Sequence, residues 1–247
     1  PSNINELKNI KKNLFSFRNY RIEITNDAVT FSASLYEGEL KHFFSDYQNY
    51  YYVKERCGKN DVSLTVVRDV RLHSEPLAKA LIKGVLEAGG NVVDLGVGPT
   101  PFGYYSEFID APYGHVDGSL IITASHNPPE YNGLKMTCQK QSLNEQQIKD
   151  VKNITQKVID GEYTQTNGQG RYEQFDMVEC YTEMQKQMYG TDKKNVKIVT
   201  DCANAAAGVV APQMLKACGY DVVELFTELD GRFPNHHPNP SIESTLD

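Results

Sequence analysis

The sequence lacks several features, and most of these absences exclude a class of protein. The 247 residues contain no tryptophan, which decides nothing, and no run of about 18 consecutive apolar residues of the kind that spans a membrane. Residues 1–15 contain no apolar core and no small-residue cleavage site, so we expect no signal peptide. The five cysteines form no C-x-x-C pair and are odd in number. We therefore expect free thiols and a cytoplasmic protein.

Basic residues are outnumbered and scattered along the chain. Lys plus Arg number 25 against 32 Asp plus Glu, which gives a net charge of −7. Binding to a phosphate backbone needs a clustered basic surface, so we expect no nucleic-acid partner and no membrane partner. Apolar residues make up 40% of the chain. This length and composition predict a folded protein with one large or two small domains, at about 100–200 residues each.

Residues 63–97 show the pattern of a strand, a helix and a second strand. The β-branched run 63–70 predicts the first strand, and 91–97 predicts the second. Between them, 77–86 carries apolar residues at helical spacing, with Ser74 expected to cap the helix. A βαβ unit of this length implies two parallel strands joined by a right-handed crossover.

The same alternation continues along the chain. A third apolar strand is expected at 119–125 and a short strand at 133–138. Asn144 and Gln147 have the spacing of a capping box, which predicts the start of a long amphipathic helix.

A polar, glycine-rich segment at 161–170 is expected to link two domains. A second α/β pattern follows, with a helix at 177–189 and a strand at 196–200. We predict an α/β fold with mixed, largely parallel sheets sandwiched by helices. One full domain is expected at 9–163 and part of a second, similar domain at 171–247.

The segment with the clearest chemical potential is TASHNPPEYNGLK, residues 123–135. It follows an apolar strand, so Ser125 is expected at the carboxyl end of the sheet, where open α/β folds bind ligands. The turn signal of Asn132-Gly133 is expected to return the chain and place Lys135 beside Ser125 and His126. An ordinary surface loop is the simplest alternative. A serine hydrolase is disfavoured, because there is no G-x-S-x-G elbow and adjacent side chains rarely align as base and nucleophile.

This loop resembles the phosphoserine loop of the α-D-phosphohexomutase family, the phosphomannomutase and phosphoglucomutase enzymes, over thirteen contiguous positions. Four other segments are similar to motifs of that family, and they occur in the expected order. VRDVR at 67–71 resembles G-R-D-x-R, with Val67 in place of the glycine, and 94–101 resembles D-x-G-x-x-P-T-P. Residues 201–208 resemble the D-C-x-N-x-x-x-G turn, and 230–238 resemble D-G-x-F-P-N-H-H-P. The resemblance extends from about residue 17 to the last residue.

The resemblance implies reversible transfer between hexose 1-phosphate and hexose 6-phosphate. Ser125 would carry a phosphoryl group and pass it to mannose or glucose 1- or 6-phosphate, and hexose 1,6-bisphosphate would return its other phosphoryl group. Phosphoserine carries about −1.5 to −2 charge, so Mg²⁺ is the expected cofactor, with a phosphate oxygen on Ser125 as one ligand. Lys135 would add positive charge or assist proton transfer, and His126 would transfer a proton or shape the loop.

Three further residues are candidates for binding the substrate. Tyr20 matches a substrate-contacting tyrosine of the family. Arg68 and Arg71 are candidate phosphate ligands, but Arg68 and Asp69 are alternatively a structural pair that braces the loop. Of these two interpretations, the structural pair is favoured.

Three departures from the family pattern limit the prediction. Glu23 occupies the position of a catalytic arginine, which would be repulsive beside two phosphates unless Arg21 compensates. Alanines replace the usual glycines within 203–206. The acidic metal loop and the sugar-specificity domain are expected beyond this chain, so the chain alone is predicted to be an inactive fragment. The alternative function is that of a non-catalytic sugar-phosphate-binding or interaction relative.

Two weaker signals are set aside. His236 and His237 suggest zinc, but adjacent histidines point apart and no further Cys or His ligands surround them. A structural or interdomain role is favoured for this pair. Gly96 and Gly98 lack the spacing of a dinucleotide-binding loop.

Overall fold

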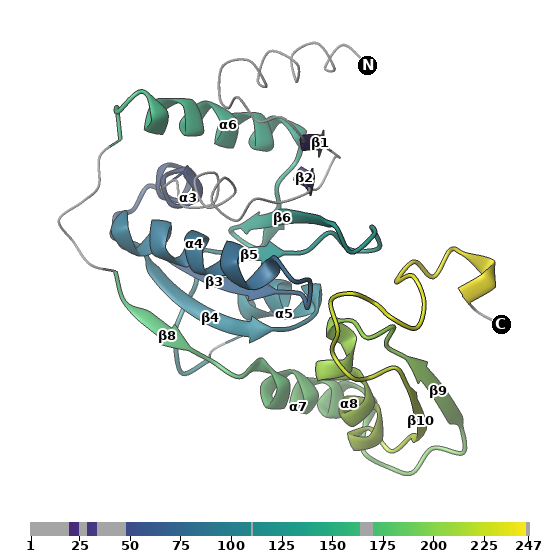
Figure 1. Ribbon diagram of the computed structural model, residues 1–247. Helices are drawn as coiled ribbons and strands as arrows, with labels where there is room; N and C mark the ends of the chain where they lie inside the picture. Colours follow the sequence, from purple (N-terminus) through teal and green to yellow (C-terminus); the bar gives the residue numbers. More distant parts are fainter. Residues whose placement is uncertain (1–19, 25–28, 34–47, 110, 164–169, 246–247) are drawn as a thin grey trace.

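The computed structural model describes residues 20–24, 29–33, 48–109, 111–163 and 170–245, and of the first two ranges it describes only the backbone. Figure 1 shows the arrangement of the elements. In chain order they are β1 (Tyr20–Ile24), β2 (Val29–Ala33), α3 (Gln48–Cys57), β3 (Ser63–Arg68), α4 (Ser74–Glu87), β4 (Asn91–Val97), α5 (Thr100–Ser106), β5 (Gly118–Ile122), β6 (Tyr131–Cys138), β7 (Gln141–Ser142), α6 (Glu145–Ile159), β8 (Tyr172–Gln174), α7 (Met177–Tyr189), β9 (Lys197–Asp201), η1 (Ala206–Val209), α8 (Ala211–Ala217), β10 (Asp221–Leu225) and η2 (Glu243–Thr245).

The larger sheet is mixed, with a parallel centre. Its strand order is β1-β2-β6-β5-β3-β4-β8, and β7 pairs with β6. Strand β3 runs parallel to both β4 and β5, and β8 runs parallel to β4. Strands β6, β2 and β1 extend the sheet in antiparallel register. The predicted α/β class with a mixed sheet is confirmed, and parallel pairing among the described strands of this sheet is confined to β5, β3, β4 and β8.

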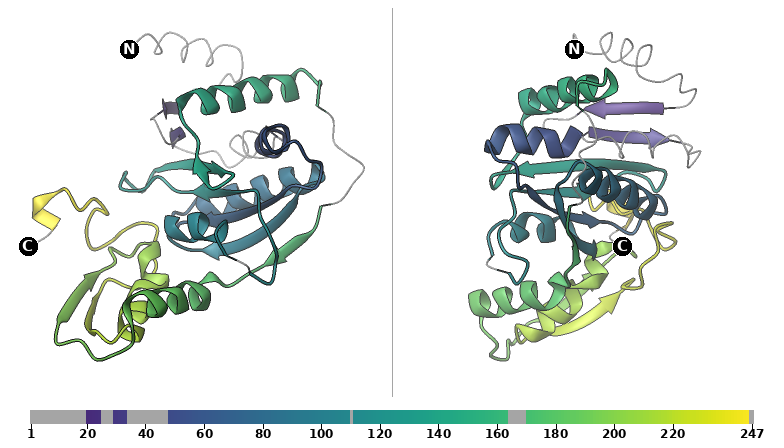
Figure 2. Two further views of the ribbon diagram at one scale, coloured as in Figure 1. Left: turned by 180° about the vertical axis from the view of Figure 1, so that it is seen from behind. Right: turned by 90° about the vertical axis from the view of Figure 1, so that its left-hand side faces the viewer.

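The central strands are apolar on both faces because helices cover both faces. Leu64 and Val66 on β3 belong to a core that also contains buried residues of α3, α4 and α6. Val67, the next residue along, belongs to a second core with Phe102 of α5 and Met177 of α7. Because side chains alternate across a strand, neighbouring residues of β3 enter different cores. The result is a helix–sheet–helix sandwich, which can be followed from two sides in Figure 2.

A smaller unit follows the sandwich. Its strands β9 and β10 are paired in parallel, and Figure 1 shows α8 beside them, with α7 on the other side of α8. Strand β8, which the sequence analysis placed in the second domain, lies at the edge of the first sheet. The first structural unit therefore extends past residue 163 at least to Gln174.

Local signals predicted helix starts with mixed success. Asn144 accepts from the backbone N–H of Gln147, and the Gln147 side chain accepts from the N–H of Asn144, so the capping box is confirmed. The helix predicted at 177–189 is α7. The prediction that Ser74 caps α4 is wrong. The N-cap position is His73, and the Ser74 hydroxyl is engaged by Asp69 and Asn132 instead.

Within the described ranges, no helix combines the length and apolar character needed to cross a membrane. The five cysteines are free thiols.

Candidate active site

Ser125 lies just beyond the carboxyl end of β5, on the loop that leads to β6. Its backbone has φ 50°, a left-handed conformation that non-glycine residues rarely adopt. The N–H of Ser125 donates to Oγ1 of Thr123 at 2.9 Å. The backbone and side-chain nitrogens of Asn127 both donate to the carbonyl oxygen of Ala124. These bonds keep the loop backbone satisfied while Ser125 and His126 remain exposed.

Arg71 holds this loop from beneath. Its side chain is fully buried, and its Nε donates to Oδ2 of Asp69 at 3.0 Å. Its two terminal nitrogens donate to four backbone carbonyl oxygens of the loop, those of Ser125, Asn127, Pro128 and Tyr131. A guanidinium has five N–H donors, and all five are used here. Arg71 therefore has no donor left for a phosphate ligand, and its role is to fix the loop.

Asp69 is the anion that compensates Arg71. Its Oδ1 accepts from the N–H of Arg71 and from the hydroxyl of Ser74, at 3.1 and 2.5 Å. Its Oδ2 accepts from the hydroxyl of Thr123 at 2.8 Å, and Thr123 in turn accepts from the N–H of Ser125. The pair that braces the loop is thus Asp69 with Arg71, not Asp69 with Arg68 as the sequence analysis expected.

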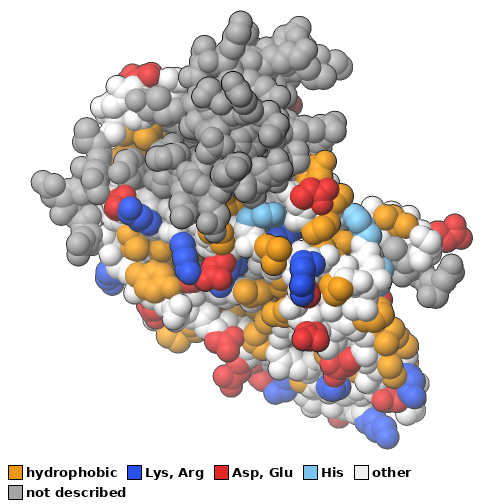
Figure 3. Space-filling view, in the orientation of Figure 1, with side chains coloured by type: hydrophobic (Ala, Val, Ile, Leu, Met, Phe, Trp, Pro, Cys, Tyr) orange, Lys and Arg blue, Asp and Glu red, His pale blue; other side chains and the backbone are white. Residues whose placement is uncertain are grey.

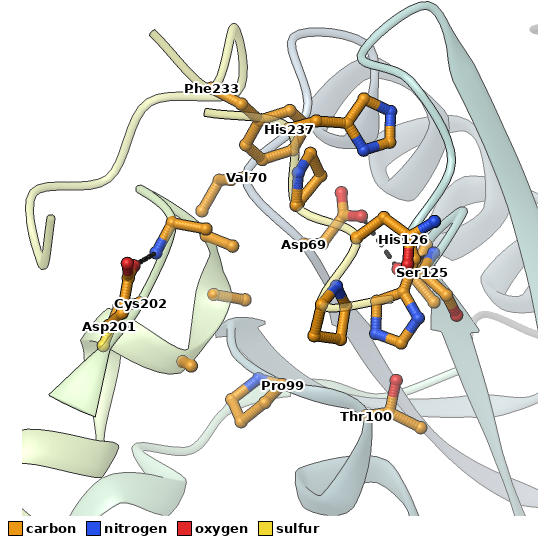
Figure 4. A pocket seen from close by; sticks show the side chains of 18 of the residues that line it. Asp69, Val70, Pro99, Thr100, Ser125, His126, Asp201, Cys202, Phe233 and His237 are labelled. Atoms are coloured by element: carbon orange, nitrogen blue, oxygen red, sulfur yellow. Dashed lines mark hydrogen bonds between the residues drawn. The ribbon is translucent and has the colours of Figure 1, made fainter. Parts of the chain in front are cut away.

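The loop forms one wall of a cavity of about 430 Å³ between the two units. Ser125, His126 and Thr100 line it from the first unit, and Asp201, His236 and His237 line it from the second. Figure 4 shows Asp69, Ser125 and His126 grouped on one side, with Asp201 and Cys202 on the other. In the space-filling view, histidine side chains show at separate places on this face of the molecule (Figure 3).

His236 faces two hydrogen-bond acceptors on the second-unit wall. Its Nδ1 lies 3.0 Å from the carbonyl oxygen of His237, and its Nε2 lies 2.9 Å from Oδ2 of Asp201. Both ring nitrogens thus face acceptors, which favours the protonated ring. The hydrogen bond to the His237 carbonyl, followed by the Asp201 carboxylate, raises the pKa of His236. His237 also lines the cavity, and its Nδ1 is buried with no hydrogen-bond partner among the described residues.

Sequence reasoning did not find the His236–Asp201 pair, because its members are 35 positions apart. Both residues belong to motifs that resemble the family, but nothing local indicates that the two motifs meet.

The predicted site residues are only partly brought together. Ser125 and His126 share the cavity wall, whereas its described lining includes neither Lys135 nor Arg68. Lys135 is paired across the sheet with Ile121 of β5. Arg68 ends β3, where its carbonyl oxygen accepts from the N–H of Gly98. Tyr20 and Glu23 belong to β1, and their side chains lie outside the described part of the structure.

The described residues do not by themselves make a metal centre. They contain no group of three or more His, Cys, Asp or Glu side chains placed to hold an ion. Mg²⁺ takes an octahedral set of oxygen ligands, usually including one or two carboxylates. This part of the chain does not supply such a set.

Fold and site together define a two-unit α/β protein that presents a serine from a braced strand-end loop into a cavity between the units. Residues 49–161 match the family model for phosphoglucomutase/phosphomannomutase α/β/α domain I, and residues 178–247 match the model for domain II. The chain belongs to the phosphoglucomutase/phosphomannomutase family.

Individual relatives agree with this assignment. A phosphomannomutase/phosphoglucomutase of Pseudomonas putida is 40% identical over 195 residues, covering 78% of this chain and 40% of that protein. One of Pseudomonas aeruginosa is 36% identical over 193 residues, covering 78% of this chain and 39% of that protein. A solved structure of a phosphoglucomutase/phosphomannomutase family protein of Burkholderia thailandensis is 31% identical, with a TM-score of 0.75, covering 90% of this chain and 47% of that one. The chain therefore spans less than half the length of each.

Proposed function

We propose that this chain supplies the phosphoserine of a phosphohexomutase, which interconverts hexose 1-phosphate and hexose 6-phosphate of mannose or glucose through hexose 1,6-bisphosphate. The observation that carries the proposal is the placement of Ser125. It is exposed on a cavity wall at the carboxyl end of β5, and the buried Arg71 fixes its loop by four carbonyl contacts. The substrate class, mannose and glucose phosphates, is inferred from the names of the relatives.

The proposed reaction has two phosphoryl transfers. In the first, the bond between phosphorus and Oγ of Ser125 breaks while a bond forms to a free hydroxyl oxygen of the hexose monophosphate. The hydroxyl loses its proton, and Oγ gains one. In the second transfer, the bisphosphate returns its other phosphoryl group to Oγ, with the protons moving in the opposite sense.

His126 is the proposed proton carrier. It follows Ser125 directly, lines the same cavity and is exposed, so its ring has access to a bound hydroxyl group. The rigid loop is the contribution of Arg71 and Asp69, because phosphoryl transfer depends on positioning and charge stabilisation more than on covalent chemistry of the protein.

Three further parts of the proposal concern binding. Lys135 adds positive charge near the transferring group, and Tyr20 and Arg68 contact the substrate. Mg²⁺ would neutralise phosphate charge, with a phosphate oxygen on Ser125 as one ligand. The described residues contain no group of three or more His, Cys, Asp or Glu side chains that could hold the ion. The chain alone is proposed to present Ser125 without turning over hexose phosphates.

The alternative proposal is a non-catalytic sugar-phosphate-binding or interaction relative. It is favoured by one observation, the acidic Glu23 at a position where the family resemblance implies a catalytic arginine. A binding protein of this kind would retain the cavity but would not exchange its phosphoryl group.

The test uses the full-length protein that contains this chain, isolated from its native source. Intact mass and phosphopeptide mapping are expected to show one phosphate, located on Ser125. Ser125→Ala should abolish mutase activity on mannose and glucose 1-phosphate. Ser142→Ala, which alters an exposed serine of β7, is the matched control and should leave activity unchanged.

Two results would contradict the mutase proposal. One is a native protein never phosphorylated at Ser125, together with unchanged activity of Ser125→Ala. The other is labelling of Ser125 by a fluorophosphonate, which would support a serine hydrolase. Binding of hexose phosphate without any exchange of phosphate would support the non-catalytic alternative.

A further inference from the structure

The N–H donors of the Arg71 guanidinium are all used by Asp69 and the loop, and the second unit contacts the same group through Phe233. Cζ of Arg71 lies over the ring of Phe233, 5.1 Å from the ring centroid. A cation within about 6 Å of a ring centroid is attracted to the π-face, more strongly where both groups are removed from water. Arg71 is 2% exposed and Phe233 is 8% exposed. The contact is therefore a desolvated cation–π pair.

The turn that carries Phe233 approaches the first unit backbone to backbone. A Cβ at Gly231 would lie 2.2 Å from the carbonyl oxygen of Val70, the residue before Arg71, so only glycine permits this approach. The N–H of Phe233 donates to the carbonyl oxygen of Asp230 at 2.9 Å, and Phe233 has φ 51°. The ring is thus presented by a tight turn rather than by a flexible loop.

The same turn is anchored within the second unit. The N–H of Asp230 donates to the carbonyl oxygen of Asn204 at 2.9 Å. The side chain of Asn204 donates to the carbonyl oxygen of Glu228 and accepts from Asn235, at 2.9 and 2.7 Å. Asn204 is buried and follows β9 closely. A continuous chain of contacts therefore runs from the strand end of the second unit, through Phe233, to Arg71 and the Ser125 loop.

We propose that Phe233 is a positioning residue that couples the second unit to the Ser125 loop through Arg71. The ring restricts the guanidinium plane, and the guanidinium fixes four carbonyl oxygens of the loop. A shift of the second unit would thus be transmitted to Ser125 through Arg71, and the Phe233 ring itself also lines the cavity. The kinetic consequence rests on the proposed function, but the structural coupling does not.

The first test is hydrogen exchange in the full-length protein. Phe233→Leu keeps an apolar side chain but removes the π-face, and Phe233→Tyr restores it. Phe175→Leu is the matched control, because Phe175 packs edge-to-face on Tyr113 instead of on Arg71. The amides of Asn127 and Tyr131, which are bonded within the loop, should exchange about thirtyfold faster in Phe233→Leu, the size expected for loss of one desolvated cation–π contact. Phe233→Tyr should restore the wild-type rate.

The second test asks whether Phe233 acts through Arg71. Arg71→Lys removes the planar set of donors, so adding Phe233→Leu to it should cause no further increase in loop exchange. Single-turnover transfer from the phosphorylated enzyme to hexose phosphate should slow in Phe233→Leu, with KM unchanged, and recover in Phe233→Tyr.

Equal loop exchange in Phe233→Leu and Phe175→Leu would overturn the coupling. Additive effects of Phe233→Leu and Arg71→Lys would overturn the route through Arg71. Failure of the wild-type protein to transfer phosphate at all would instead refute the proposed function, and the hydrogen-exchange result would still decide the coupling.

Discussion

Nε2 of His236 lies 2.9 Å from Oδ2 of Asp201, across 35 positions of sequence, on the cavity wall that faces the Ser125 loop. The hydrogen bond from His236 to the His237 carbonyl and the Asp201 carboxylate both favour the charged ring and raise the pKa of His236 above its ordinary 6.5. A histidine whose pKa is higher in the folded protein than in the unfolded chain stabilises the fold. This stabilisation is complete at pH values below the pKa of the unfolded chain, and it is lost as the pH rises through the pKa of the folded protein.

Asp201→Asn should lower the pKa of His236 in an NMR titration. Part of the upward shift should survive, because its first cause is the His237 carbonyl and not Asp201. The variant should lose more thermal stability relative to wild type at pH 6 than at pH 9. Asp176→Asn is the control, since asparagine can still cap α7 there, and it should leave the His236 titration unchanged. An unaltered His236 titration in Asp201→Asn would contradict the assigned pair.

Asp69→Asn should destabilise the protein by about 3 kcal/mol, the usual cost of breaking a buried ion pair by removing one partner. Asp69 accepts four hydrogen bonds, from Arg71, Ser74 and Thr123, and an amide nitrogen would face donors in place of one oxygen. Urea unfolding measures the change. Glu75→Gln, which breaks an exposed pair with Lys79, should have little effect. Equal unfolding curves for the two variants would show that the Asp69 network is not structural.

The buried carboxyl group of Glu107 should make the stability of the protein depend on pH. The carboxyl group is buried, accepts from the Thr137 hydroxyl and lies 2.7 Å from the N–H of Lys140. Burial raises the pKa of Glu107 above its ordinary 4.5, against the opposing effect of these donors. The favourable contribution of Glu107 to the free energy of unfolding is therefore complete below pH 4.5. It is lost as the pH rises through the raised pKa of the folded protein.

Glu107→Gln should become more stable relative to wild type as pH rises from 4 to 7, in urea titrations at several pH values. The control Glu145→Gln should change in the opposite direction. Hydrogen bonding to Lys149 lowers the pKa of Glu145, so Glu145 stabilises the wild-type protein more as the pH rises. Glu145→Gln lacks this stabilisation. The same pH trend in both variants would contradict the assignment for Glu107.

Ala203→Gly should stabilise the protein. Ala203 has φ 48°, a left-handed conformation that costs a residue with a Cβ about 1–2 kcal/mol. Glycine costs about 0.4–1 kcal/mol because it gives the unfolded chain more conformational freedom, so a net gain of up to about 1.6 kcal/mol is expected. Ala205→Gly is the matched control, because Ala205 has φ −96° and gains nothing from glycine. Destabilisation of both variants in urea unfolding would contradict the assigned strain.

Local sequence signals succeeded where their partners are neighbours in the chain. The capping box of Asn144 and Gln147 spans three residues and forms as predicted. Ser74 also has a side chain that could cap a helix, but its hydroxyl does not do so. The fold brings Asp69 and Asn132 to this hydroxyl, and it bonds with them instead of with the N–H groups at the start of α4.

The choice between two arginines shows the same limit. Arg68 and Arg71 are three residues apart around Asp69, and charge alone does not distinguish them. Arg71 pairs with Asp69 because the strand has ended at Arg68, and the following turn directs Arg71 beneath the loop carbonyls. Lys135 lies opposite Ile121 on β6 and the described cavity lining does not include it, so its expected position beside Ser125 stays a prediction.

The sequence by itself determined the α/β class, the strand-end position of Ser125 and the family resemblance, because hydrophobic periodicity and contiguous motifs are properties of short segments. The tertiary structure alone decided that Arg71 uses its donors on Asp69 and the loop, that Arg71 lies over the Phe233 ring, and that His236 meets Asp201. These contacts join residues far apart in the chain, and their energies depend on burial and geometry that exist only once the two units are packed.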